Sequence, residues 1–271
     1  MIRFERFDDR ELDTFRRRQR LSYDVLTRVM GRLEPGVTER DATRWVMQGY
    51  REAGADRFFH LPVALFGSRT GLPDPWTTQD FWPSERVLEP GDAVILDASP
   101  VFGGFVVDTA VSASRVPDAA HAAAAAADVT YRDVILTAVR SGATFREIAA
   151  GVDSDMTAAG YRNCHRLHPE GVLGHRAVRL LDPAGLPPPD PSGFDPTLLR
   201  WFIEGIDAAA RGGSPSPTWN DSAGSDHRPA SGLWAVEPHL AKGDVGVKWE
   251  ELLVVEEHDA YWLDDDVPHM R

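Results

Sequence analysis

Two aspartates placed inside apolar runs constrain this chain more than any other feature of its sequence. Asp97 lies within AVILDAS (93–99) and Asp108 within FVVDTAVSAS (105–114), with PVFGG between the two runs. Short apolar runs separated by a glycine-rich turn predict a buried β-hairpin. An ionised carboxylate is very costly in an apolar interior unless it has a partner. We therefore expect a cationic group beside both side chains.

The expected register of this hairpin brings the two carboxylates together. A turn at Phe102-Gly103 pairs Asp97 directly with Asp108 on one face of the two strands. Like charges about 5 Å apart repel each other, unless a metal ion between them reverses the sign of the interaction. The hairpin therefore predicts a metal site.

A second hairpin near the C-terminus repeats this pattern in the apolar segments GLWAVEPH (232–239) and VGVKWEELLVVEE (245–257). Gly243-Asp244 suits a two-residue turn, because glycine comes first, as a type II′ turn prefers. This turn places Glu237 opposite Glu250. Two facing carboxylate pairs in one chain favour a shared cation site over two unrelated turns.

A nitrogen ligand for such a site is expected from the histidines. His175, in GVLGHRAVRLL, follows a glycine and has apolar neighbours, whereas His168, His227 and His239 lie in polar or turn-like surroundings. Four carboxylates and one imidazole suit two divalent ions such as Mn²⁺, Fe²⁺, Co²⁺ or Zn²⁺. Two ions about 3.5–4 Å apart activate water and polarise a carbonyl, which is the chemistry of amide hydrolysis.

Composition excludes several other classes of protein. The formal net charge of −13 argues against a surface for nucleic acid or anionic lipid, since both need clustered lysine and arginine. Cys164 is the only cysteine, so an intrachain disulfide and a thiolate metal cage are excluded. The N-terminal residues are highly charged, and no window of about 18 residues is apolar enough to span a membrane. Cytoplasmic residence is the default expectation.

Periodicity and turn signals predict the remaining elements. We expect two helices within 10–53, the second capped by Thr38, then a strand at 58–67, and helices at 118–142 and 144–161. Residues 182–231 contain two Pro/Gly/Ser-rich stretches around a short helix at 196–210. Because the strands on either side need the same sheet, we interpret 182–231 as a surface insertion in one domain covering 1–271.

Four motifs, in order, resemble those of the pita-bread metallohydrolases, a family that includes methionine aminopeptidase, Xaa-Pro aminopeptidase, prolidase and creatinase. The motifs are GDAVILDASPVFGGFVVDTAVSAS, GVLGHRAV, GLWAVEP and VGVKWEELLVV. The resemblance extends upstream to the opening helices, and it implies an α+β pita-bread fold in which helices cover an antiparallel sheet. We expect no N-terminal domain of the prolidase kind in this chain. The five metal-ligand positions of the peptidase branch are matched by Asp97, Asp108, His175, Glu237 and Glu250.

The resemblance also implies a role for each ligand. Asp108 and Glu250 would bridge both ions and Asp97 would bind one of them. His175 and Glu237 would bind the other ion, with Glu237 as the catalytic proton shuttle. The implied reaction is hydrolysis of an amide or related C–N bond in a small molecule or short peptide, and homodimers are common in the family.

The sequence departs from the family at two substrate-contacting histidines, whose positions align with Asp74 and Asp182. Either change replaces a neutral donor by an anion that only accepts hydrogen bonds. His60 or His227 could supply a replacement. Two alternatives therefore stay open: a non-peptide C–N hydrolase or a lyase of a specialised pathway, and a non-catalytic binding module on the same fold.

Overall fold

The computed structural model describes residues 1–116, 118–212 and 215–271. The helices are α1 (Asp9–Arg32), α2 (Glu39–Glu52), α3 (Ala119–Arg140), α4 (Phe145–Ala158) and α5 (Pro196–Ala210). The strands are β1 (Ile2–Arg3), β2 (Arg57–Phe58), β3 (Val63–Phe66), β4 (Ala93–Ala98), β5 (Pro100–Phe102), β6 (Phe105–Val106), β7 (Thr109–Ser114), β8 (Arg162–Asn163), β9 (Gly174–Ala177), β10 (Arg179–Leu180), β11 (Thr218–Trp219), β12 (Gly232–Val236), β13 (His239–Lys242), β14 (Val245–Lys248), β15 (Glu251–Val255) and β16 (Ala260–Trp262).

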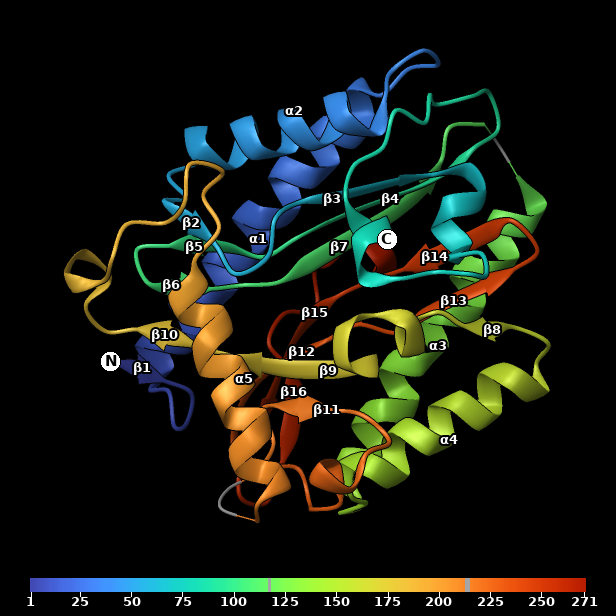
Figure 1. Cartoon of the computed structure of the whole chain (residues 1–271). Coiled ribbons are helices and arrows are strands. Elements are labelled where there is room, and N and C mark those ends of the chain that lie inside the picture. The colour runs from blue at the N-terminus through green and yellow to red at the C-terminus, as the bar shows by residue number, and fades with distance from the viewer. Residues whose placement is uncertain (117, 213–214) are drawn as a thin grey trace.

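Antiparallel strands form four sheets between two pairs of helices. The strand orders are β1-β10-β6-β5-β2, β11-β9-β12-β15-β16, β14-β13-β8 and β3-β4-β7. Helices α1 and α2 lie together along one side of the strands, and α3 and α4 lie along the other (Figure 1). Two large apolar clusters follow this division, one under α1 and α2 and one under α3 and α4. The fold is therefore α+β, as predicted.

The first hairpin forms, but the predicted register was wrong by two residues. The turn falls on Gly103-Gly104, with φ values of +58° and +89°, because a two-residue hairpin turn favours two residues with positive φ. As a result Asp97 pairs with Ala110 and not with Asp108. Side chains alternate with a period of two, so both aspartates still face the same side of the hairpin.

The second hairpin has the predicted register. Its turn falls on Gly243-Asp244, Gly243 has a φ of +59°, and Lys242 pairs with Val245. The same register continues in the neighbouring sheet, where Val236 pairs with Glu251. Glu237 and Glu250 lie between these two ladders, where the chain passes from one sheet to the next.

A single bridge joins the two hairpins. Ala110, the partner of Asp97, also pairs with Glu250 across an antiparallel bridge. Asp97, Ala110 and Glu250 therefore lie side by side on three neighbouring segments. This contact brings the carboxylates of the two hairpins to one place.

The predicted strand at 58–67 is interrupted. β2 ends at Phe58 and β3 begins at Val63, so residues 59–62 lie outside both strands. Pro62 has no backbone N–H with which to continue a ladder, which explains the break. The helices match their predictions closely. Thr38 caps α2 by accepting a hydrogen bond from the backbone N–H of Asp41.

The segment 182–231 contributes the helix α5, with the predicted bounds, and the short strand β11. β11 pairs with β9, and Trp219 on it is fully buried. Part of this segment is thus built into the central strands, and its status as an insertion stays a prediction. Among the described residues, no helix is both long and apolar enough to cross a membrane.

Gly246→Ala should destabilise the fold. A Cβ added at Gly246 would lie 1.9 Å from the carbonyl oxygen of Thr70, so the backbone of one segment has to move. We expect a loss of about 1–3 kcal/mol in the free energy of unfolding, measured by urea denaturation. Gly151→Ala is the control: Gly151 lies in α4 with open space around it, and the change should stabilise by about 0.5–1 kcal/mol. An unchanged urea midpoint for Gly246→Ala would contradict the contact.

Candidate metal centre

The five predicted ligands lie on or directly beside strands of two sheets, β3-β4-β7 and β11-β9-β12-β15-β16. Asp97 lies on β4 and His175 on β9, while Asp108 comes directly before β7, Glu237 directly after β12 and Glu250 directly before β15. Each of these five residues is buried, with an exposed fraction between 1% and 8%. The predicted ligands therefore converge at one buried place, although they span more than 150 positions of the sequence.

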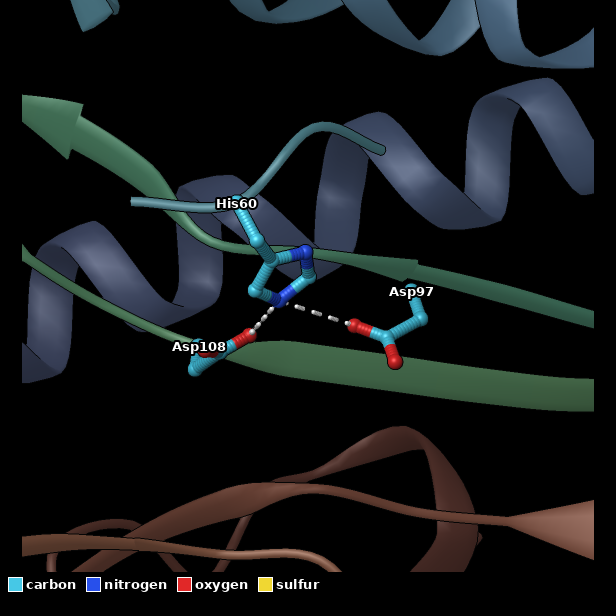
Figure 2. Close-up of side chains that lie close together, drawn as sticks. All are labelled: His60, Asp97 and Asp108. Atoms are coloured by element: carbon cyan, nitrogen blue, oxygen red, sulfur yellow. Dashed lines mark hydrogen bonds and ion pairs between the residues drawn. The ribbon is translucent and has the colours of Figure 1, made fainter. Parts of the chain in front are cut away.

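Asp108 lies between two imidazoles. Its Oδ1 is 3.2 Å from Nε2 of His60, and its Oδ2 is 3.3 Å from Nε2 of His175. His60 also faces Asp97, with 3.6 Å between Nε2 and Oδ1 (Figure 2). Both oxygens of Asp108 thus point at nitrogen atoms that can bind a metal.

His175 faces the two glutamates as well. Its Nε2 lies 3.7 Å from Oε1 of Glu250 and 3.9 Å from Oε1 of Glu237. With Asp108, these contacts give His175 three carboxylate neighbours.

Lys248 is a cation that the sequence analysis missed. Its Nζ lies 2.5 Å from Oδ2 of Asp97, 2.8 Å from Oε2 of Glu237 and 3.2 Å from Oε2 of Glu250. Only 3% of the lysine side chain is exposed. The missed signal is of the kind that identified the aspartates, namely a charged residue inside the apolar run VGVKWEELLVV.

A chain of two histidines runs outward from Glu237. Nδ1 of His168 is 2.8 Å from Oε2 of Glu237, and its Nε2 is 3.0 Å from Nδ1 of His239. Nε2 of His239 lies 2.7 Å from the carbonyl oxygen of Thr70. Both ends of this chain are acceptors, so its three hydrogen bonds need three hydrogens, while two neutral imidazoles bring two. The third hydrogen has three possible carriers, Glu237, His168 and His239. Burial lowers the pKa of both histidines. Burial would raise the pKa of Glu237, but the charges of Lys248 and His168 outweigh it and lower the pKa, so each of the three favours its form without that hydrogen.

The electrostatics of the cluster reflect its crowded carboxylates. Burial raises the pKa of Glu250, and the charge of Asp108 adds to this effect, giving about 8. Burial alone would lower the pKa of His60, but the charges of Asp108 and Asp97 outweigh it and raise the pKa to about 10. For His175 the same balance of burial against its carboxylate neighbours raises the pKa well above its ordinary value. The imidazoles therefore hold protons at neutral pH where no metal replaces them.

The donor atoms fit divalent cations. Four carboxylate oxygens accept no hydrogen bond from any described residue: Oδ1 of Asp97, Oδ2 of Asp108, and both oxygens of Glu250. Bonds of about 2.0–2.2 Å around a tetrahedral ion place neighbouring ligand atoms roughly 3.3 Å apart. The contacts of His60 and His175 with Asp108 have this spacing, and two groups are compact enough for an ion: His60-Asp97-Asp108 and Asp108-His175-Glu250.

The other predicted substrate residues lie elsewhere. Asp74 is exposed, and Asp182 is exposed and caps a short helical turn by accepting a hydrogen bond from the N–H of Gly185. His227 packs against Phe145 and contacts the carbonyl of Arg228. Within the described part of the chain, only His60 of these four contacts the carboxylate cluster.

The fold and this cluster together define the pita-bread class of metal-binding domains, and comparison with known proteins agrees. The sequence profile of metallopeptidase family M24 matches residues 13–198, more than half of the chain. The chain therefore belongs to metallopeptidase family M24. The matched range includes Asp97, Asp108 and His175, while Glu237 and Glu250 lie beyond it.

Solved structures show the same fold. The X-Pro aminopeptidase from Thermotoga maritima MSB8 matches with a TM-score of 0.68 at 16% identity, covering 96% of this chain and 62% of that one. The prolidase from Pyrococcus furiosus matches with a TM-score of 0.67 at 16% identity, covering 96% and 65%. Dipeptidase PepE from Mycobacterium ulcerans matches with a TM-score of 0.62 at 19% identity, covering 97% and 59%. This chain thus spans less than two thirds of the length of these three proteins. A sequence search of curated proteins found no match.

Cation binding should release protons. His60 and His175 are protonated below their raised pKa values, and a ligand nitrogen must lose its proton to bind a metal. The apparent affinity for Zn²⁺ or Mn²⁺ should therefore rise with pH, by up to about tenfold per pH unit for each proton displaced. Calorimetric titrations in buffers of different ionisation enthalpy count these protons. A binding enthalpy independent of the buffer would contradict the prediction.

Proposed function

We propose that this chain is a hydrolase of an amide or related C–N bond in a small substrate such as a short peptide, and that it uses two divalent cations. The observation that carries the proposal is Asp108, whose two oxygens each face a different imidazole. A carboxylate with a nitrogen ligand on either side is suited to bridge two ions. The X-Pro aminopeptidase, prolidase and dipeptidase among the structural neighbours support a peptide substrate.

Asp97, Asp108, His175, Glu237 and Glu250 would hold the ions, which can be Mn²⁺, Fe²⁺, Co²⁺ or Zn²⁺ for this mixture of oxygen and nitrogen donors. When bound, such a pair polarises a carbonyl and makes water a better nucleophile. Two divalent ions would carry four positive charges against the four buried carboxylates, and Lys248 adds a fifth.

Glu237 is the proposed proton shuttle. A shuttle has to gain and lose a proton during the reaction. His168 contacts Oε2 of Glu237, and His239 continues this chain of contacts to the carbonyl oxygen of Thr70. Glu237 therefore has a partner that can share a proton with it while its Oε1 faces His175.

We also propose that residues 1–271 form one catalytic domain with 182–231 as an insertion, and that the protein is cytoplasmic and assembles as a homodimer. The burial of Trp219 and the pairing of β11 with β9 support one domain, because the segment shares a core with the strands around it.

Asp108→Ala should remove both ions and the activity together. Loss of the bridging carboxylate takes a ligand from each ion, so we expect metal content to fall from about two equivalents towards zero. The value of kcat/KM for short peptides should fall by about 10³-fold or more. Elemental analysis of protein purified without chelator and a panel of short peptides and non-peptide amides measure both effects.

Asp24→Ala, an exposed substitution in α1, is the matched control and should keep full metal content and activity. Full metal retention by Asp108→Ala would contradict the bridging role. Turnover of non-peptide amides alone would favour the non-peptide hydrolase, and two equivalents of metal without turnover would favour a binding module.

A further inference from the structure

His60 lies beside the proposed metal centre, in the short segment that connects β2 to β3. Its ring points between Asp97 and Asp108 (Figure 2). Nε2 of the ring is 3.2 Å from Asp108 and 3.6 Å from Asp97. The other nitrogen, Nδ1, lies 3.0 Å from the carbonyl oxygen of Leu61.

The contact with Leu61 determines the tautomer of neutral His60. A carbonyl oxygen only accepts, so Nδ1 carries the hydrogen and Nε2 presents its lone pair to the two aspartates. Metal-binding histidines have this arrangement, in which one nitrogen donates to a backbone carbonyl and the other binds the ion. His175 shows the same pattern, with Nδ1 near the carbonyl of Arg176 and Nε2 among the carboxylates.

Lys248 limits the number of carboxylate oxygens that are available to a cation beside Asp97. It contacts Oδ2 of Asp97 and Oε2 of Glu250, so the oxygens that remain free of it are Oδ1 of Asp97 and Oε1 of Glu250. Oε1 of Glu250 faces His175. A cation beside Asp97 would then have just two of these carboxylate oxygens, one from Asp97 and one from Asp108.

We propose that His60 is a sixth metal ligand and binds the cation held by Asp97 and Asp108. This inference rests on the proposed function. Each ion then has one imidazole, His60 on one side and His175 on the other, with Asp108 between them. Nζ of Lys248 lies 3.2 Å from Oε2 of Glu250, while Oε1 faces His175, so Asp108 would be the bridge and Glu250 would serve the ion beside His175.

The test is a titration of metal-free protein with Co²⁺, followed by visible absorption and calorimetry. Wild type should bind two equivalents. His60→Ala should keep the equivalent at His175 and weaken the other by more than the roughly 10–100-fold that loss of an outer-shell partner costs. His60→Gly should regain the second equivalent when free imidazole is added, because imidazole can fill the vacated position. His258→Ala, which is highly exposed, should bind as wild type does.

Circular dichroism checks that each variant is folded. We expect folded variants, because the His60 side chain is about one third exposed and its removal leaves no large cavity. Two equivalents of unchanged affinity and absorption in His60→Ala would overturn the proposal. The same holds if imidazole does not restore the second equivalent in His60→Gly. Loss of one equivalent in His60→Ala, with no hydrolysis of any amide by wild type, would leave His60 a ligand and refute the hydrolase. A wild type that binds no metal would refute both.

Discussion

The balance of buried charge is the constraint on which the rest of this structure depends. Asp97, Asp108, Glu237 and Glu250 are all nearly inaccessible to solvent, and four ionised carboxylates cannot share such a place without cations. Lys248 neutralises part of the charge from one side. The imidazoles of His60 and His175 face the same carboxylates from the other side, and their raised pKa values show how strongly the cluster attracts positive charge.

The arrangement of the two hairpins brings these charged groups together. The bridge between Ala110 and Glu250 joins the hairpins, and the change of sheet at Glu237 turns its side chain toward His175. Lys248 contacts three carboxylates, those of Asp97, Glu237 and Glu250. In each of them one oxygen faces the lysine and the other faces an imidazole. The lysine thereby fixes which oxygen of each carboxylate is available to a metal.

Local chemistry explains which features were predictable from the sequence. The second hairpin has one strong candidate turn, Gly243-Asp244, so its register was predicted correctly. The first hairpin offered two overlapping turns, and the choice of Phe102-Gly103 over Gly103-Gly104 moved the register by two residues without changing the face of Asp97. That error was harmless because side chains on a strand alternate. A one-residue error would have separated the aspartates.

Long-range contacts were harder to predict from the sequence. Lys248 was overlooked because a lysine near the end of a strand usually reaches solvent, and only the tertiary structure shows its ammonium enclosed by three carboxylates. His60 was expected to contact substrate, but the break in the strand before Pro62 turns its ring toward Asp97 and Asp108. His168 and His239 had polar neighbours in sequence, and the contacts of His168 with Glu237 and with His239 join segments about 70 residues apart.

The proposed ligands are drawn from nearly the whole length of the chain, from His60 to Glu250. The ion beside Asp97 would take its ligands from residues 60–108 alone, whereas the ion beside His175 would need ligands from both halves of the polypeptide. A cation beside His175 would act as a reversible crosslink between the two halves. The resistance of the protein to unfolding then depends on the concentration of free metal around it, by RT ln(1 + [metal]/Kd) for each site.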